Sequence, residues 1–409
     1  MRAYERLLRY ARVWTTSDPE NEACSPSAER ELDLARILVE EMKRLGIRDA
    51  GLDENGYVTG HIPATPGLEN RTKLGFIAHM DTAPDASGKD VRPQIHEHYD
   101  GKAVALGDGK VLDPADFPEL TQMKGKTLIT TDGTTLLGAD DKAGIAEILT
   151  LVETLRDQKL PHGPLSIAFT PDEEIGLEAH LFNLKQFGAD YAYTVDGGAT
   201  SEITYENFNA AGAQFEIRGV SVHTGSAKDL MINAGLVACE INAMLPAADI
   251  PRLTEGREGF FHLESISGTV EKAEVSYLVR DHSEGHFQAR LDLLRHIEKT
   301  INEKYGEGTV KLTIKQQYRN MEEKIRPCMH LVENARKAIS ALGITPDSAP
   351  VRGGTDGAAL SFRGLPCPNL GTGGYGFHGP FEHITAEDMD DEVKILTGIV
   401  ASYAEPQEG

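Results

Sequence analysis

Residues 76–81 end an apolar run with a histidine and an aspartate that stand two positions apart. An apolar run of this length, closed by polar residues and Pro84, is typical of a buried strand that enters a loop. Residues i and i+2 of a strand point to the same side, so His79 and Asp81 are expected to leave the strand together. An imidazole steadied by a carboxylate is a common metal ligand, although many strands simply end in polar residues.

Two adjacent aspartates, Asp140 and Asp141, stand in front of a segment with helical spacing of apolar residues, 145–155. A helix N-terminus stabilises negative charge through its dipole and its free N–H groups. Ordinary N-capping would explain one of the two aspartates. A pair exceeds what a cap needs, so the second is a candidate for chemistry.

Carboxylates also follow the predicted strands 164–170 and 191–195. Three stand in a row at 172–174, where they would repel one another unless a cation lay among them. Asp196 follows the other strand. Because sites in open α/β sheets form at the carboxyl ends of strands, this repeated pattern predicts a metal site at one sheet edge.

The candidate ligand set has two imidazoles, three carboxylates and no thiolate: His79, Asp140, Glu174, Asp196 and His378. Such nitrogen and oxygen ligands suit zinc, with manganese or cobalt as alternatives. Five side chains fit two metals about 3.5–4 Å apart if one carboxylate bridges them. A water bridging two ions would have a pKa near ~7, and Glu173 is predicted to act as general base. Together these groups predict hydrolysis of a carbonyl compound.

The composition narrows the class of protein. The chain has 409 residues and a net charge of −23, which argues against nucleic acid as a partner. No apolar run approaches the ~18–20 residues that cross a bilayer, and no signal peptide opens the chain, so we expect a cytoplasmic protein without a membrane partner. Four widely spaced cysteines favour free thiols over a disulfide framework.

The elements that must position these residues divide into two domains. Residues 26–45 have helical spacing, with Ser25 or Ser27 as the expected N-cap. After residue 208 the pattern changes to βαββαβ, a small α+β sandwich. We therefore predict an α/β fold. A mixed-sheet catalytic domain flanked by helices would comprise residues 1–207 and 320–409, with a smaller α+β domain inserted at 208–319.

Six segments in this order resemble the co-catalytic di-zinc exopeptidase family that includes carboxypeptidase G, over essentially the whole chain. They are His79-Met80-Asp81 and residues 138–144, 172–176, 194–198, 352–357 and 378–379. Within that family the resemblance implies a zinc-dependent tripeptide aminopeptidase, which removes the N-terminal residue from small peptides with a free amino terminus. A related N-acyl amino acid deacylase or carboxypeptidase with the same two metals is the alternative.

The resemblance also implies a role for each ligand. Asp140 would bridge the two metals. His79 and Asp196 would complete one site, and Glu174 and His378 the other.

Two further residues would support the chemistry. Asp81 would hold the His79 ring, and Glu173 would be the base and later the proton donor. The peptide bond between Asp140 and Asp141 is expected to be cis.

The inserted domain resembles the lid of this family, and such lids often support a homodimer. His223, in the segment 221–225, would stabilise the developing oxyanion, or is a surface histidine near a turn. Arg280 would clamp the terminal carboxylate of the peptide, which would explain selection by length. Asn233 and Arg352 are further substrate-binding candidates, each with a structural role as the alternative.

Overall fold

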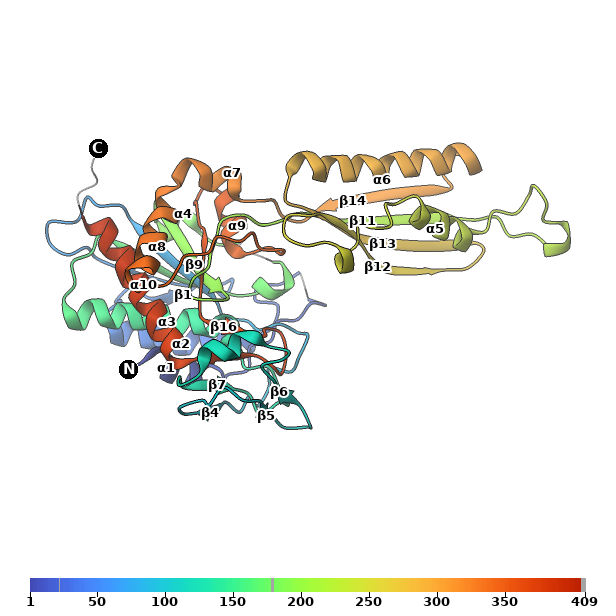
Figure 1. The fold of residues 1–409 in the computed structure, drawn as a ribbon. Helices are drawn as coiled ribbons and strands as arrows, with labels where there is room; N and C mark the ends of the chain where they lie inside the picture. Colours follow the sequence, from blue (N-terminus) through green and yellow to red (C-terminus); the bar gives the residue numbers. More distant parts are fainter. Residues whose placement is uncertain (22, 178–179, 406–409) are drawn as a thin grey trace. The chain divides into compact units, whose positions relative to one another are not determined.

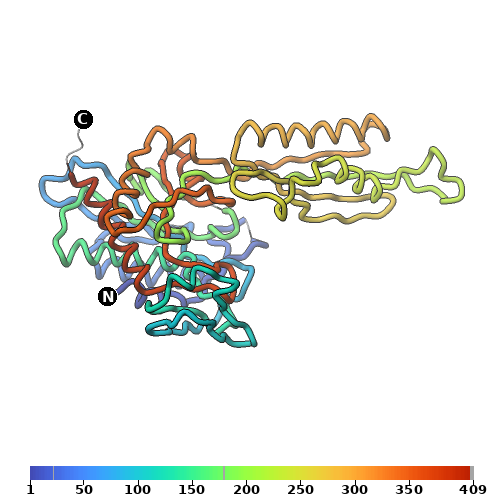
Figure 2. The backbone as a smooth tube through the Cα atoms, viewed as in Figure 1, coloured from blue at the N-terminus to red at the C-terminus, as the bar shows by residue number. Residues whose placement is uncertain are grey.

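The computed structural model describes residues 1–21, 23–177 and 180–405, and the chain forms two compact units (Figures 1 and 2). The first unit comprises Met1–Tyr205, Glu323–Ala349 and Thr355–Gly409, and the second comprises Glu206–Glu322 and Pro350–Gly354. The domains predicted from the sequence have boundaries at 207/208 and 319/320, with residues 350–354 in the first domain, and their roles as catalytic domain and inserted lid stay a prediction.

The first unit is built on a seven-stranded mixed sheet with the order β1-β2-β8-β3-β9-β15-β10. Strands β8, β3, β9 and β15 run parallel, and the outer pairs are antiparallel. The strands are β1 (Gly51–Leu52), β2 (Val58–Ile62), β8 (Leu165–Thr170), β3 (Leu74–His79), β9 (Tyr191–Gly197), β15 (Asn369–Gly371) and β10 (Ile203–Thr204).

Helices cover both faces of this sheet because its central strands are apolar on both sides. Phe76 of β3 stacks on Tyr193 of β9, whose hydroxyl donates to the Leu331 carbonyl. The next residue, Ile77, points the opposite way and packs in a cluster with Phe187. The helices are α1 (Ala3–Tyr10), α2 (Glu31–Leu45), α3 (Ala139–Gln158), α4 (Leu184–Phe187), α7 (Glu322–Ile325), α8 (His330–Ala341), α9 (Asp356–Phe362) and α10 (Ala386–Ala404).

The parallel strands bring the chemistry-bearing loops to one edge. Carboxyl ends of neighbouring parallel strands meet at the same side of a sheet. His79 is the last residue of β3, Glu173 follows β8, and Asp196 lies near the end of β9. The edge predicted from the repeated pattern of strand ends is therefore the observed one.

Helix α3 starts irregularly at this edge. The peptide between Asp140 and Asp141 is cis, as the resemblance implied, and neither residue has helical backbone angles. The Oδ1 atom of Asp141 accepts the N–H of Gly144, as an N-cap does, so the regular helix begins after Asp141. Asp141 is thus the capping aspartate, and the side chain of Asp140 is not used as a cap.

A four-stranded sheet, β16-β17-β7-β4, lies in the same unit. Its strand β17 pairs with β7 and anchors the segment that follows His378. The bounds are β16 (Gly374–Tyr375), β17 (His383–Thr385), β7 (Leu128–Thr130) and β4 (Gln94–His96), and a separate pair is formed by β5 (Val104–Ala105) and β6 (Val111–Leu112).

The second unit has the predicted βαββαβ order, and the α/β fold class is confirmed. Its antiparallel sheet runs β12-β13-β11-β14. Phe215, Tyr277 and Phe287 lie in one buried core between this sheet and its helices. The elements are β11 (Asn209–Arg218), α5 (Ala234–Ala243), β12 (Phe260–Gly268), β13 (Lys272–Asp281), α6 (Glu284–Tyr305) and β14 (Val310–Gln316).

One helix boundary differs from the prediction. Helix α2 begins at Glu31 rather than near residue 26, and neither Ser25 nor Ser27 caps it. Both carboxylate oxygens of Asp172 accept the backbone N–H of Ser27, at 2.8 and 2.9 Å. Among the described helices, none is long and apolar enough to cross a membrane.

We predict that Gly144→Ala destabilises the protein. A Cβ atom at this position would lie 1.9 Å from the carbonyl oxygen of Val195, so α3 would have to move off β9. Overpacking of this kind typically costs about 1–3 kcal/mol. Urea unfolding measures the change. Gly285→Ala in α6 is the control, because the nearest atom to a Cβ at that position, Ser283 Oγ, would be 3.8 Å away. An unchanged midpoint for Gly144→Ala would contradict the prediction.

Candidate metal centre

His79 is fixed in orientation by contacts on both ring nitrogens. Its side chain is buried, and Nδ1 lies 3.1 Å from the carbonyl oxygen of Asp81 and 3.3 Å from Asp81 Oδ1. On the other side, Nε2 lies 2.9 Å from Asp140 Oδ1 and 3.3 Å from Asp196 Oδ1. The Nε2 atom therefore faces two carboxylates, while Nδ1 faces Asp81.

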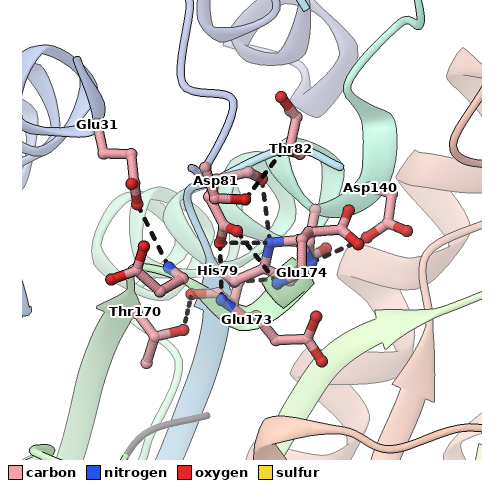
Figure 3. A network of polar contacts seen from close by, with 12 residues as sticks. Glu31, His79, Asp81, Thr82, Asp140, Thr170, Glu173 and Glu174 are labelled. Atoms are coloured by element: carbon pink, nitrogen blue, oxygen red, sulfur yellow. Dashed lines mark hydrogen bonds and ion pairs between the residues drawn. The ribbon is translucent and has the colours of Figure 1, made fainter. Parts of the chain in front are cut away.

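Asp140 lies between two histidines. His79 faces its Oδ1 atom, and His378 Nε2 lies 3.2 Å from its Oδ2 atom. The same Nε2 of His378 is 3.0 Å from Glu174 Oε2. The five predicted ligands thus form one connected cluster: His79 and His378 face different oxygens of Asp140, Asp196 contacts His79, and Glu174 contacts His378. Figure 3 shows His79, Asp140 and Glu174 converging.

Asp81 holds more than the His79 ring. Its Oδ1 and Oδ2 atoms accept the backbone N–H groups of Glu173 and Glu174 at 3.0 and 3.1 Å (Figure 3). A buried carboxylate that accepts backbone N–H groups fixes the loop that carries them. Asp81 therefore positions the loop after β8 as well as the imidazole at the end of β3.

The cluster has strong internal electrostatics. Burial raises the pKa of Asp196 to about 7, against the favourable charge of His79. Burial and the charge of Asp140 raise the pKa of Glu174 to about 7. Hydrogen bonds to Asp140 and Glu174 raise the pKa of His378 to about 11. The pKa of Glu173 is raised as well, first by burial and then by the charge of Asp196. These carboxylates hold their negative charge at a cost that a cation would remove.

Two groups of these side chains have donor atoms close enough to share an ion. In one, donor atoms of His79, Asp140 and Glu174 lie within 4.8 Å of one another; in the other, His79 and Asp196 are joined by Asp141. Both oxygens of Asp141 already accept backbone N–H groups, Oδ2 from His79 and Oδ1 from Gly144. Asp141 is thus engaged by the backbone, whereas the oxygens of Asp140 face the histidine nitrogens of His79 and His378.

The predicted substrate-binding residues belong to the second unit. His223 is exposed, and its Nδ1 accepts the N–H of Gly225 at 3.1 Å. Asn233 is the N-cap of α5, where its side chain accepts the N–H of Leu236 at 3.2 Å.

Arg280 and Arg352 differ in the hydrogen bonds that their guanidinium groups donate. One guanidinium nitrogen of Arg280 donates to two backbone carbonyls, and the group lies over the Tyr318 ring. Arg352 donates to the carbonyls of Gly256 and Glu258 and to Thr254 Oγ1. Its contacts hold the 254–258 loop, the structural alternative considered for this residue.

Two buried side chains beside the cluster, Glu382 and Lys142, were not predicted from the sequence. Glu382 accepts three backbone N–H groups from residues 137–140, and Lys142 donates to the carbonyl of Val13. Burial lowers the pKa of Lys142 to about 7, opposed by the charges of Glu382 and Asp81. One feature of the sequence could have indicated Glu382. Gly138, at the start of α3, has no side chain that could accept the N–H groups of residues 137–140, so another part of the chain must supply the acceptor.

Comparison with known proteins agrees with this geometry. The family model described as peptidase family M20/M25/M40 matches residues 131–402. The chain is 50% identical to peptidase T of Alkaliphilus oremlandii over 404 residues, 98% of each chain. It is 51% identical to peptidase T of Clostridium perfringens over 405 residues, 99% of each chain.

Solved structures share the fold. The aminopeptidase PepT of Bacillus cereus matches with a TM-score of 0.78 at 23% identity, over 99% of this chain and 98% of that one. The YXEP protein of Bacillus subtilis, described as a dinuclear metal binding peptidase from the M20 family, matches with a TM-score of 0.65 at 14% identity, over 98% of each chain. The resemblance found in the ordered segments is confirmed, and the chain belongs to the peptidase family M20/M25/M40.

Proposed function

We propose that this chain is a metal-dependent aminopeptidase that removes the N-terminal residue from tripeptides. The observation that carries the proposal is the carboxylate of Asp140 between two histidine–carboxylate pairs, in a chain about half identical to peptidase T proteins. The first unit would carry the catalysis, and the second would be its lid. The cytoplasmic location and the homodimer stay predictions from the sequence.

The donor set fits two zinc ions, with manganese or cobalt as alternatives. His79, Asp140 and Asp196 would hold one ion, and Asp140, Glu174 and His378 the other. All donors are imidazole nitrogens or carboxylate oxygens, which suit zinc. The Oε1 atom of Glu174 is buried without a hydrogen-bond partner among the described residues, and a cation would supply the missing contact. The dinuclear site named for the Bacillus subtilis protein supports the count of two.

Two bound divalent cations would acidify the attacking water and polarise the peptide carbonyl. The rest of the chemistry falls to the chain's own residues. Glu173 would take the proton of the water, because its raised pKa makes it a stronger base than an ordinary glutamate. It would then pass the proton to the leaving amine. Asp81 would keep Glu173 and Glu174 in position by accepting their backbone N–H groups.

Substrate recognition would come from the second unit. His223 has an exposed ring whose Nε2 is not used by its contact with Gly225, so it could donate to the developing oxyanion. Arg280 would bind the C-terminal carboxylate of the peptide. Asn233 and Arg352 support substrate binding less directly, because their side chains cap α5 and hold the 254–258 loop.

Glu173→Gln is expected to lower kcat for a tripeptide about 10²–10⁴-fold and to leave the metal content unchanged. An amide of the same size removes the base but none of the proposed ligands. Steady-state kinetics and elemental analysis on the same preparation measure both. The neighbouring change Glu174→Gln is the matched control and should lower metal content. Wild-type kcat in Glu173→Gln would contradict the assigned base.

The substrate class is tested with a tripeptide that carries a free amine and with its N-acetylated form. An aminopeptidase cleaves only the first, whereas a deacylase acts on the second. Arg280→Ala should raise KM for the tripeptide because the terminal carboxylate loses its partner. Arg218→Ala, which removes an exposed arginine of the second unit, is the control. Preference for the acetylated peptide would overturn the proposed class, and unchanged KM and kcat in Arg280→Ala would remove its role.

Without metal, stability is expected to fall as pH rises from 5 to 8. Glu174 and Asp196 have a pKa of about 7 in the folded chain, above the ~4 of an unfolded carboxyl. The stability they contribute is present below pH ~4 and is lost as pH rises through 7. The pKa of His378 is raised to about 11, above the ~6.5 of an unfolded histidine. The stability that this histidine contributes is therefore also lost as pH rises above ~6.5.

Thermal unfolding of chelator-treated protein at pH 5, 6.5 and 8 measures this slope, and Zn²⁺ should reduce it. Glu174→Gln removes one of the titrating groups and should flatten it. A midpoint that stays constant or rises with pH in the metal-free wild type would contradict the assignment.

A further inference from the structure

The carboxylate of Glu382 holds the backbone on which Asp140 stands. Its side chain is 1% exposed. The Oε2 atom accepts the N–H groups of Leu137 and Gly138 at 2.6 and 2.8 Å, and Oε1 accepts the N–H of Asp140 at 3.0 Å. One carboxylate thus binds three N–H groups within four consecutive residues.

These N–H groups need an acceptor from elsewhere in the chain. Residues 137–140 precede the regular part of α3, and Asp140 itself has non-helical backbone angles. Gly138 offers no capping side chain. A buried N–H without a partner is strongly unfavourable, so the irregular loop depends on the acceptor that Glu382 provides.

Glu382 is itself anchored by regular structure. The next residue, His383, starts β17 and pairs in register with Thr130 of β7. The buried side chain of Lys142 is close enough for the charge of Glu382 to oppose the lowering of its pKa by burial. The carboxylate therefore links a sheet on one side to the loop of Asp140 on the other.

The same device occurs at the other side of the cluster. Asp81 accepts the N–H groups of Glu173 and Glu174, the loop after β8. Glu382 serves the loop before α3 in the same way. Glu173 and Glu174 lie in a single 3-10 turn, Glu173–Ile175, and Asp140 has non-helical backbone angles, so neither segment has a long regular element at this point.

We propose that Glu382 is a positioning residue that fixes the backbone of Asp140, so that its two carboxylate oxygens face the His79 and His378 sides of the centre at once. Glu382 does not touch the reacting atoms in this assignment. The proposal rests on the proposed function for the meaning of the two sides, but the hydrogen bonds it invokes exist without a metal.

The test compares Glu382→Gln with Glu387→Gln, both on metal-free full-length protein. Glutamine keeps the size of the side chain and one acceptor oxygen, but its amide nitrogen is a donor, so the N–H groups that faced the replaced oxygen lose their acceptor. Glu387 is a matched control because its carboxylate also accepts a backbone N–H, from Thr127 at 2.7 Å, away from the centre. Amide hydrogen exchange is measured first, and Zn²⁺ affinity by titration calorimetry second.

In Glu382→Gln we expect exchange to rise about tenfold or more at Asp140 or at the pair Leu137 and Gly138, whichever faces the amide nitrogen, while the amides of Glu173 and Glu174 keep their protection. Zn²⁺ affinity should fall about 10–100-fold, the usual effect of losing a group that orients a ligand. Glu387→Gln should change neither quantity. Unchanged exchange at residues 137–140, or an equal rise at Glu173 and Glu174, would overturn the local role.

If Glu382→Gln does not fold, hydrogen exchange of the metal-free wild type tests the proposal. Its amides at Leu137, Gly138 and Asp140 must then be protected in the metal-free protein, and fast exchange there overturns the proposal. Failure of the proposed function gives a different result: wild-type protein would bind no pair of Zn²⁺ ions, while the exchange difference between Glu382→Gln and Glu387→Gln would remain.

Discussion

The whole centre depends on the excess of negative charge at the carboxyl edge of the parallel strands. Asp140, Glu174 and Asp196 meet there with two histidines, and burial is the main cause that raises the pKa of Glu174 and Asp196 to about 7. Carboxylates of this kind repel one another in a poorly hydrated site unless positive charge is supplied. The two imidazoles do this in the metal-free chain, and divalent cations would do so more completely.

Two kinds of buried carboxylate share this edge, and the difference lies in what their oxygens face. Asp81, Asp141 and Glu382 accept backbone N–H groups and so determine where the loops run. Asp140 and Glu174 turn their oxygens toward histidine nitrogens. The first kind makes the second possible, because a loop without strand or helix pairing needs side-chain acceptors to hold its shape.

Much of this arrangement could be predicted from residue types and spacing. His79, Glu174 and Asp196 follow apolar strands, and the parallel order of β8, β3 and β9 brings those ends together as the pattern suggested. His378 lies 3.2 Å from Asp140 and 3.0 Å from Glu174. The other histidine of that segment, His383, is buried in β17 and contacts Glu119 at 3.6 Å instead.

The parts that could not be predicted depend on contacts between residues far apart in the chain. Glu382 binds a loop more than 240 positions away, and Asp172 accepts the N–H of Ser27, 145 positions earlier, in a segment where a helix start was expected. Arg352 was a substrate candidate by its motif, yet its donors hold a loop nearly 100 positions earlier. Local periodicity carries no information on such partners, because backbone N–H and C=O groups are present at nearly every residue.

The central claim is that Asp140 joins two cations, and diffraction at the zinc absorption edge from crystals grown with Zn²⁺ tests it most directly. The account predicts two anomalous peaks about 3.5–4 Å apart, each about 2.0–2.2 Å from a different oxygen of Asp140. One peak should lie beside His79 and Asp196, and the other beside Glu174 and His378. A single peak, or two peaks that leave Asp140 without a metal contact, would contradict it.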